Sequence, residues 1–120
     1  MATFTKRVGA SADDGFGAKD GSGTFNTSWN WITLGNNFPA SVAYFRFLDV
    51  TIPQGSTINS AKLTFYFSSG SNNDIVTKIY GVDEDNTGSL ATDPRSRSKT
   101  TAYSRWSKSA PSAHTAFDTA

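Results

Sequence analysis

The chain of 120 residues contains no cysteine, so disulfide bonds and zinc sites with cysteine ligands are excluded. With a single histidine, His114, a metal site built from several histidines is excluded too. Apolar runs of transmembrane length are lacking, and residues 1–9 hold no apolar core of the kind that a signal peptide needs. We therefore expect a protein that is made in the cytoplasm, is not inserted into a membrane and has no signal peptide.

Helical periodicity is lacking as well. No window places apolar residues at i, i+3, i+4 and i+7 for more than about one turn. What the chain has instead is nine Phe, four Tyr and three Trp set among many Ser, Thr, Asn, Gly and Ala residues. This composition favours strands joined by many turns, and the length fits one domain with one core.

Net charge is nearly absent, at +1, but it is unevenly distributed. Residues 1–94 hold six Lys and Arg against nine Asp and Glu, which gives −3, whereas residues 95–120 hold five against one, which gives +4. The motifs of nucleic-acid-binding folds are missing, so we expect no nucleic-acid partner. The basic segment is expected to be solvated or to contact an acidic neighbour.

Alternation of apolar and polar residues is the clearest signal. In AKLTFYF, Leu63, Phe65 and Phe67 fall on one face of a strand and polar residues on the other. Residues 11–23 read as an exposed loop anchored by Phe16, because they hold four Gly, three Asp and two Ser. We predict strands at Thr3 to Val8, Trp29 to Leu34, Val42 to Val50, Ala61 to Phe67, Ile75 to Val82 and residues 101–107. The predicted core consists of Phe45, Phe47, Ile58, Leu63, Phe65 and Ile79.

The connection between the third and fourth predicted strands contains IPQG, residues 52–55. Proline fixes φ and donates no hydrogen bond, and glycine admits positive φ, so this stretch ends one strand and begins a turn. The connection is too long for a two-residue hairpin. It suits a chain that crosses from one sheet to another, which predicts an all-β, two-sheet antiparallel sandwich.

Three stretches carry a family resemblance: Arg46-Phe47, the segment from Ile52 to Phe65, and Gly81 to Asn86. Together they resemble a jelly-roll β-sandwich module found in phage virion proteins and in bacterial surface or carbohydrate-active proteins. The match covers about half of the chain. The resemblance implies a jelly-roll fold and a scaffold or binding role, in virion structure or in glycan recognition.

Similar modules continue past the segment that contains Trp106, whereas this sequence stops at Ala120. We therefore expect a β-sandwich body at residues 1–100 and an extended strand or tail at residues 101–120 that completes the body or docks onto a neighbouring subunit. The predicted interface residues are Arg95, Arg97, Tyr103, Arg105 and Trp106.

Residue patterns for catalysis are missing. His114 lies among small polar residues, and no nucleophile motif accompanies it, so we expect no enzymatic activity and no cofactor. Asp83 and Asp85 occupy the first and third positions of a stretch that resembles the start of a calcium loop, but Pro94 stands where an EF-hand needs Glu. An acidic turn and a calcium site therefore both remain open at this place.

Trp29 and Trp31 share one face of a predicted strand. They could line the core or form a stacking platform for sugars, so glycans are a further class of partner. The favoured function is a non-enzymatic virion structural protein, in head decoration or in a tail or fibre, that assembles with copies of itself and with other virion proteins. The alternative is a carbohydrate-binding module of a surface or carbohydrate-active protein.

Overall fold

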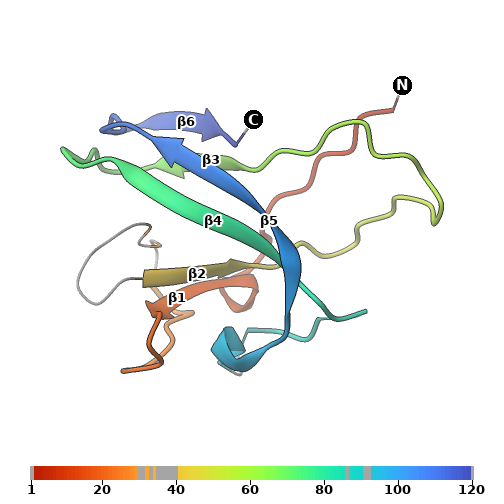
Figure 1. The fold of residues 1–120 in the computed structure, drawn as a ribbon, viewed down its shortest axis with the longest axis horizontal. Helices are drawn as coiled ribbons and strands as arrows, with labels where there is room; N and C mark the ends of the chain where they lie inside the picture. Colours follow the sequence, from red (N-terminus) through yellow and green to blue (C-terminus); the bar gives the residue numbers. More distant parts are fainter. Residues whose placement is uncertain are drawn as a thin grey trace. The chain divides into compact units, whose positions relative to one another are not determined.

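The computed structural model describes residues 2–29, 32, 34, 41–85, 87–90 and 93–119 (Figure 1). These residues form antiparallel strands and two short 3-10 helices, and they contain no α-helix. The all-β, antiparallel fold class is thus confirmed. A two-sheet jelly-roll arrangement stays a prediction. In chain order the elements are η1 (Ser11–Asp13), β1 (Asp14–Ala18), β2 (Ser41–Phe45), β3 (Thr64–Phe67), β4 (Ile75–Val82), η2 (Pro94–Ser96), β5 (Lys99–Lys108) and β6 (Thr115–Asp118).

The contacts divide the chain into two compact units. Unit 1 comprises Met1–Thr57 and Glu84–Arg97, and unit 2 comprises Ile58–Asp83 and Ser98–Ala120. Strand β1 pairs with β2 in unit 1, whereas β3 pairs with β6 and β4 pairs with β5 in unit 2. The segment predicted as a tail supplies most of β5 and all of β6, and both strands pair within this chain.

Among its described residues, unit 1 is built around the aromatic residues of the β1–β2 pair. Phe16 lies opposite Ala43 in the ladder, and the neighbouring Tyr44 is 8 % exposed. The ring of Phe25 contacts Tyr44 edge-on, with 5.7 Å between centroids. A Cβ atom added at Gly15 would lie 2.5 Å from the Phe25 ring, so glycine is required for this close approach.

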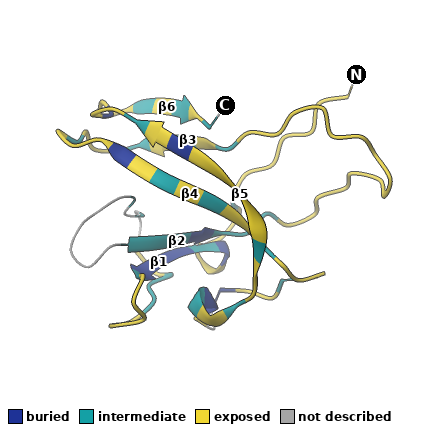
Figure 2. Ribbon diagram, viewed as in Figure 1, coloured by how far each residue is buried: buried dark blue, intermediate teal, exposed yellow. Residues whose placement is uncertain are grey.

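Unit 2 has Trp106 at its centre. The indole is 6 % exposed, and its ring centroid lies 5.3 Å from that of Phe65 and 6.5 Å from that of Phe67. The indole Nε1 donates a hydrogen bond to the carbonyl oxygen of Asp118, at 3.2 Å. Burial alternates along β4, as the bands on this strand in Figure 2 show, beginning with the buried Ile75.

Several strand predictions need correction. The β4 prediction is confirmed in both of its bounds, but residues 3–8 form no strand, and residues 14–18, within the loop predicted at residues 11–23, form β1. Strand β2 ends at Phe45 and not at residue 50, and Asp49 beyond it has φ of 52°, which interrupts an extended strand. The predicted strand at residues 29–34 falls partly outside the described residues.

The predicted core residues are also less buried than expected. Ile58 is 56 % exposed, so its assignment to the core is wrong. The other predicted core residues are half-buried in the structure: Phe45, Phe47, Leu63, Phe65 and Ile79. Buried apolar positions are instead supplied by residues such as Leu90, Pro94, Trp106 and Pro111.

Candidate functional site

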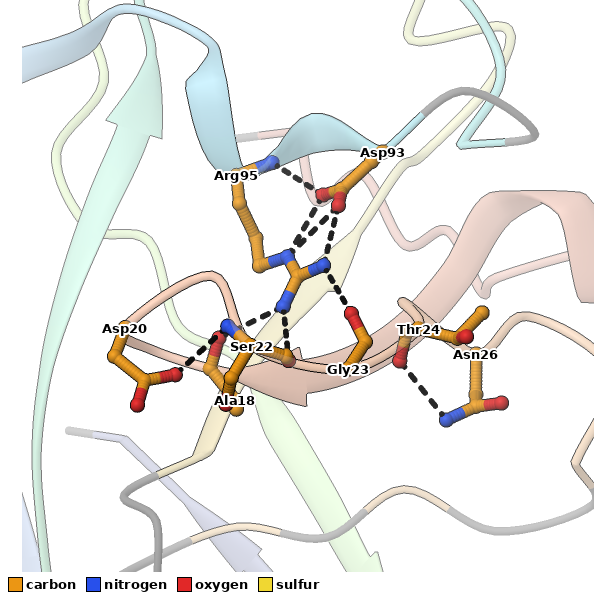
Figure 3. A network of polar contacts seen from close by, with 8 residues as sticks. All are labelled: Ala18, Asp20, Ser22, Gly23, Thr24, Asn26, Asp93 and Arg95. Atoms are coloured by element: carbon orange, nitrogen blue, oxygen red, sulfur yellow. Dashed lines mark hydrogen bonds and ion pairs between the residues drawn. The ribbon is translucent and has the colours of Figure 1, made fainter.

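The densest polar cluster that the structure describes surrounds Arg95 in unit 1 (Figure 3). The sequence Asp93-Pro94-Arg95 starts η2, because the Asp93 side chain caps the Arg95 amide at 3.0 Å and proline suits the first helical position. This turn directs the Arg95 side chain toward the loop after β1, where only 10 % of it stays exposed.

The Arg95 guanidinium fastens this loop to η2. Its Nη1 donates to the carbonyl oxygens of Ala18 and Ser22, each at 3.0 Å, and its Nη2 donates to that of Gly23 at 2.9 Å. Its Nε lies 2.9 Å from both carboxylate oxygens of Asp93, to which Nη2 also donates. All five donors of the guanidinium are thereby used. Arg95 has no donor left for a ligand, and it acts as a positioning residue.

Hydrogen bonds within the cluster shift the pKa values of three side chains. Hydrogen bonds from the Arg95 side chain hold the pKa of Asp93 below its ordinary value, and the same contact raises the pKa of Arg95. Hydrogen bonds from Ser22 lower the pKa of Asp20. The charged forms are therefore favoured throughout, which stabilises the loop and provides no group poised for proton transfer.

A shallow depression of about 400 Å³ opens beside this cluster. Its lining is polar and of mixed charge: Lys19, Asp20, Gly21, Asp93, Arg95 and Ser96. Two carboxylates and two cations compensate one another there, so the depression has no net preference for an ion of either sign.

Two more arginines of unit 1 follow the same pattern. Arg46 donates from Nε to the buried carboxylate of Asp13 at 2.7 Å and from Nη1 to the carbonyl oxygen of Thr87 at 3.2 Å. Arg97 pairs with Glu84 at 3.3 Å, and it also donates to the carbonyl oxygens of residues 88 and 89. Each arginine combines one carboxylate with loop carbonyls, so these three cations hold connections in place.

The predicted interface residues fall into three groups. Arg95 and Arg97 are engaged in the loop contacts of unit 1, and Trp106 lies in the core of unit 2. Tyr103 and Arg105 are exposed on β5. An interface role stays a prediction, and the last two residues are the members that are accessible to a partner.

The acidic candidates for metal binding are exposed. Asp83 and Asp85 have exposed side chains, and the Asp83 amide donates to the carbonyl oxygen of Ser98 at 3.0 Å. Within the described ranges, no group of three or more His, Asp or Glu residues is arranged to hold a metal ion. The acidic turn and the calcium site stay alternatives at this place. None of the helices described is long and apolar enough to cross a membrane.

The predicted glycan platform is only partly visible. Trp29 is 49 % exposed, and its ring meets that of Phe16 edge-on, with 5.3 Å between centroids. Trp31 lies outside the described residues.

In unit 2, His114 is exposed with φ of 55°, and the hydroxyl of Tyr66 lies 3.3 Å from its Nδ1.

Comparison of the chain with protein-family models, with curated proteins and with solved structures gave no match. The resemblance to jelly-roll modules stays a prediction from residues 46–47, 52–65 and 81–86. The arginine contacts were missed by sequence reasoning, since most of their acceptors are backbone carbonyls that no residue type marks.

Proposed function

We propose that this chain is a non-enzymatic structural protein that assembles with copies of itself, as a component of a virion. The observation that carries the proposal is the exposure of one continuous segment. Every residue from 48 to 62 is exposed. Four large aliphatic side chains lie in this segment: Leu48, Val50, Ile52 and Ile58, with exposed fractions between 41 % and 56 %. An exposed aliphatic segment of this length is an aggregation liability unless a partner covers it.

Unpaired strand edges support the same proposal. Among the described residues, each strand pairs along its length with one other strand, in three two-stranded ladders, and a single bridge from Phe16 to Asn26 lies at the second edge of β1. Isolated two-stranded ladders are only marginally stable, and an open edge offers backbone donors and acceptors to another chain. A second copy that adds a strand would satisfy these groups and cover aliphatic side chains in one step. The virion setting rests on one part of the resemblance described above, the likeness to modules of phage virion proteins.

The test uses the full chain with Val50→Lys and Ile58→Lys. Both side chains are more than half exposed, so neither substitution leaves a cavity in the fold. We expect the unaltered protein to sediment as an oligomer, and the double variant to sediment as a monomer with unchanged circular dichroism. Val76→Lys is the matched control, because Val76 is 54 % exposed but lies within a paired strand. Assembly of the double variant as complete as that of the control would contradict the proposal.

The virion assignment has its own test. Mass spectrometry of purified particles of the encoding virus should find the protein in many copies per particle. If the protein is absent from such particles but assembles with itself in solution, the structural role is supported and the assignment to a virion is contradicted.

Carbohydrate binding is a second candidate function, favoured by the exposure of Trp29. A glycan array with Trp29→Ala as its control separates the two, because a purely structural protein gives no signal that depends on this side chain.

A further inference from the structure

The outward face of the β4–β5 ladder carries an unusual set of side chains. Three cross-strand pairs lie on it: Val76 with Ser107, Lys78 with Arg105, and Tyr80 with Tyr103. All six residues are exposed. We call this surface the cation–tyrosine face. It belongs entirely to unit 2, and it shares no residue with the Arg95 cluster.

Two positive charges stand opposite each other at the centre of this face. Lys78 and Arg105 are directly paired across the ladder, an arrangement in which like charges destabilise a sheet. None of the ion pairs between described residues involves either side chain. Within the part of the chain that is described, neither cation is thus paired with a carboxylate, and an anion bound between the two would pair with both.

Two tyrosines lie beside this charge pair. The rings of Tyr80 and Tyr103 are 5.3 Å apart between centroids and tilted by 41°, with exposed fractions of 39 % and 51 %. The Lys78 ammonium lies 4.4 Å from the centroid of the Tyr103 ring, which fixes the cation next to the aromatic pair. Exposed tyrosines combine an apolar ring with a polar hydroxyl group, a combination suited to flat, hydroxyl-bearing rings.

We propose that the cation–tyrosine face binds an anionic polysaccharide, whose carboxylate or sulfate groups lie between Lys78 and Arg105 and whose sugar rings lie on Tyr80 and Tyr103. Neighbouring residues on one face of a strand are about 6.5 Å apart, so a charged group and an adjacent sugar ring can engage the two pairs together. The inference concerns a different surface from residues 48–62, and it holds whether or not the chain assembles.

A polysaccharide fits this face better than a nucleic acid. Nucleic-acid-binding proteins commonly contact about six to ten phosphates, whereas the centre of this face offers two cations.

The experiment measures binding to the full chain by isothermal titration calorimetry at low ionic strength. Polygalacturonate and dextran sulfate test the carboxylate and sulfate forms of the ligand. Neutral dextran tests the sugar without charge, poly-L-glutamate tests charge without sugar, and an oligothymidylate tests a nucleic acid. We expect binding to at least one acidic polysaccharide, weakened by added salt as exposed ion pairs are, and weaker binding to the other three probes.

Two variants and two matched controls locate the site. Lys78→Ser with Arg105→Ser should weaken binding about twofold to thirtyfold, the size expected for two exposed ion pairs. Arg7→Ser with Lys19→Ser removes the same charge from exposed cations of unit 1 and should change affinity little. Tyr80→Ala with Tyr103→Ala should also weaken binding, whereas Tyr66→Ala, at a side chain that is 65 % exposed on β3, should not.

Several results would overturn the proposal. They are failure to bind either acidic polysaccharide, equal losses in the variants and their controls, and binding of poly-L-glutamate or the oligothymidylate as tight as that of the polysaccharides. Because all the substituted side chains are exposed, unfolding is not expected to confuse these outcomes, and circular dichroism of each variant verifies this.

Discussion

Lys78 on β4 and Arg105 on β5 face each other directly across an exposed antiparallel ladder. Cross-strand pairs of opposite charge stabilise a sheet by about 0.2–1 kcal/mol, whereas like charges destabilise it. Replacing one of the two cations by a carboxylate should therefore strengthen the fold even though the residue has no role in the core.

The first prediction is that Arg105→Glu raises the free energy of unfolding by about 0.2–1 kcal/mol, since the new carboxylate pairs with Lys78. Arg105→Gln should give a smaller gain, because it removes the repulsion only. Urea denaturation at low salt measures both values. A variant that gains stability while losing polysaccharide affinity would show that the repulsion is maintained for binding. Lower stability in Arg105→Glu would mean that the two charges do not repel in the folded protein.

The second prediction concerns the centre of unit 2. Trp106→Ala should lower the free energy of unfolding by about 3–5 kcal/mol, because it removes a buried indole and leaves a cavity beside Phe65 and Phe67. Trp29→Ala is the control, since that ring is half exposed. Equal stabilities of the two variants would place Trp106 outside the core.

Trp106 also changes how assembly must be tested. Deleting residues 101–120 would remove most of β5 together with this side chain, so loss of assembly after that deletion would report unfolding of unit 2. Point substitutions at exposed positions such as Val50 avoid this ambiguity.

The third prediction is that Arg95→Lys loosens the loop after β1. A lysine ammonium cannot reach three carbonyl oxygens and a carboxylate at once. The Gly21 amide donates a hydrogen bond to the carbonyl oxygen of Ala18 at 3.2 Å, and the turn that this bond closes should therefore open more often. Amide hydrogen exchange at Gly21 should become faster, with a lower Tm. Exchange in β4, which belongs to unit 2, provides the internal control. Unchanged protection at Gly21 would show that the guanidinium contacts are dispensable.

The fourth prediction is a loss of stability in acid. Hydrogen bonds from Arg95 lower the pKa of Asp93, and those from Lys62 and Thr64 lower the pKa of Asp118. A carboxyl whose pKa is lower in the folded state stabilises the fold above its unfolded pKa, about 3.9, and this contribution is lost as the pH falls through the folded pKa. Asp14 acts in the opposite sense, because burial and then the charge of Asp13 raise its pKa.

Urea denaturation between neutral pH and about pH 2 measures this loss, which should lie below the unfolded pKa of about 3.9. Asp93→Asn and Asp118→Asn should each be less stable at neutral pH and should each show a shallower fall in acid. If both variants retain the full acid dependence of the unaltered protein, the two carboxylates do not carry it.

The sequence predicted β4 in full, because this strand is a continuous run that is rich in apolar residues and follows a turn. Strand β6 was missed, since Pro111 indicates the end of regular structure. The chain instead turns at His114, which has positive φ, and β6 then pairs with β3. The contacts of Arg95 with the loop after β1 could not be predicted, because their acceptors are backbone carbonyls more than seventy positions away. Long-range contacts to the backbone leave no mark in residue type.

Strand β1 failed for a different reason. Gly15 and Gly17 flank Phe16 and look like turn residues, but each stands where the Phe25 side chain passes close to the backbone. The absence of a side chain there serves packing and not turning.

The last prediction follows from this packing. Gly15→Ala should lower the free energy of unfolding by about 1–3 kcal/mol, because its Cβ would lie 2.5 Å from the Phe25 ring and 2.7 Å from the carbonyl oxygen of Asn26. The backbone at Asn26 cannot retreat freely, since it exchanges two hydrogen bonds with Phe16 at 2.8 and 3.0 Å. Gly9→Ala is the matched control, as nothing lies within 4 Å of a Cβ added there. Thermal denaturation compares the two variants. If Gly15→Ala melts with Gly9→Ala, Phe25 does not pack against β1, and the assignment of β1 as a strand closed by this ring would be wrong.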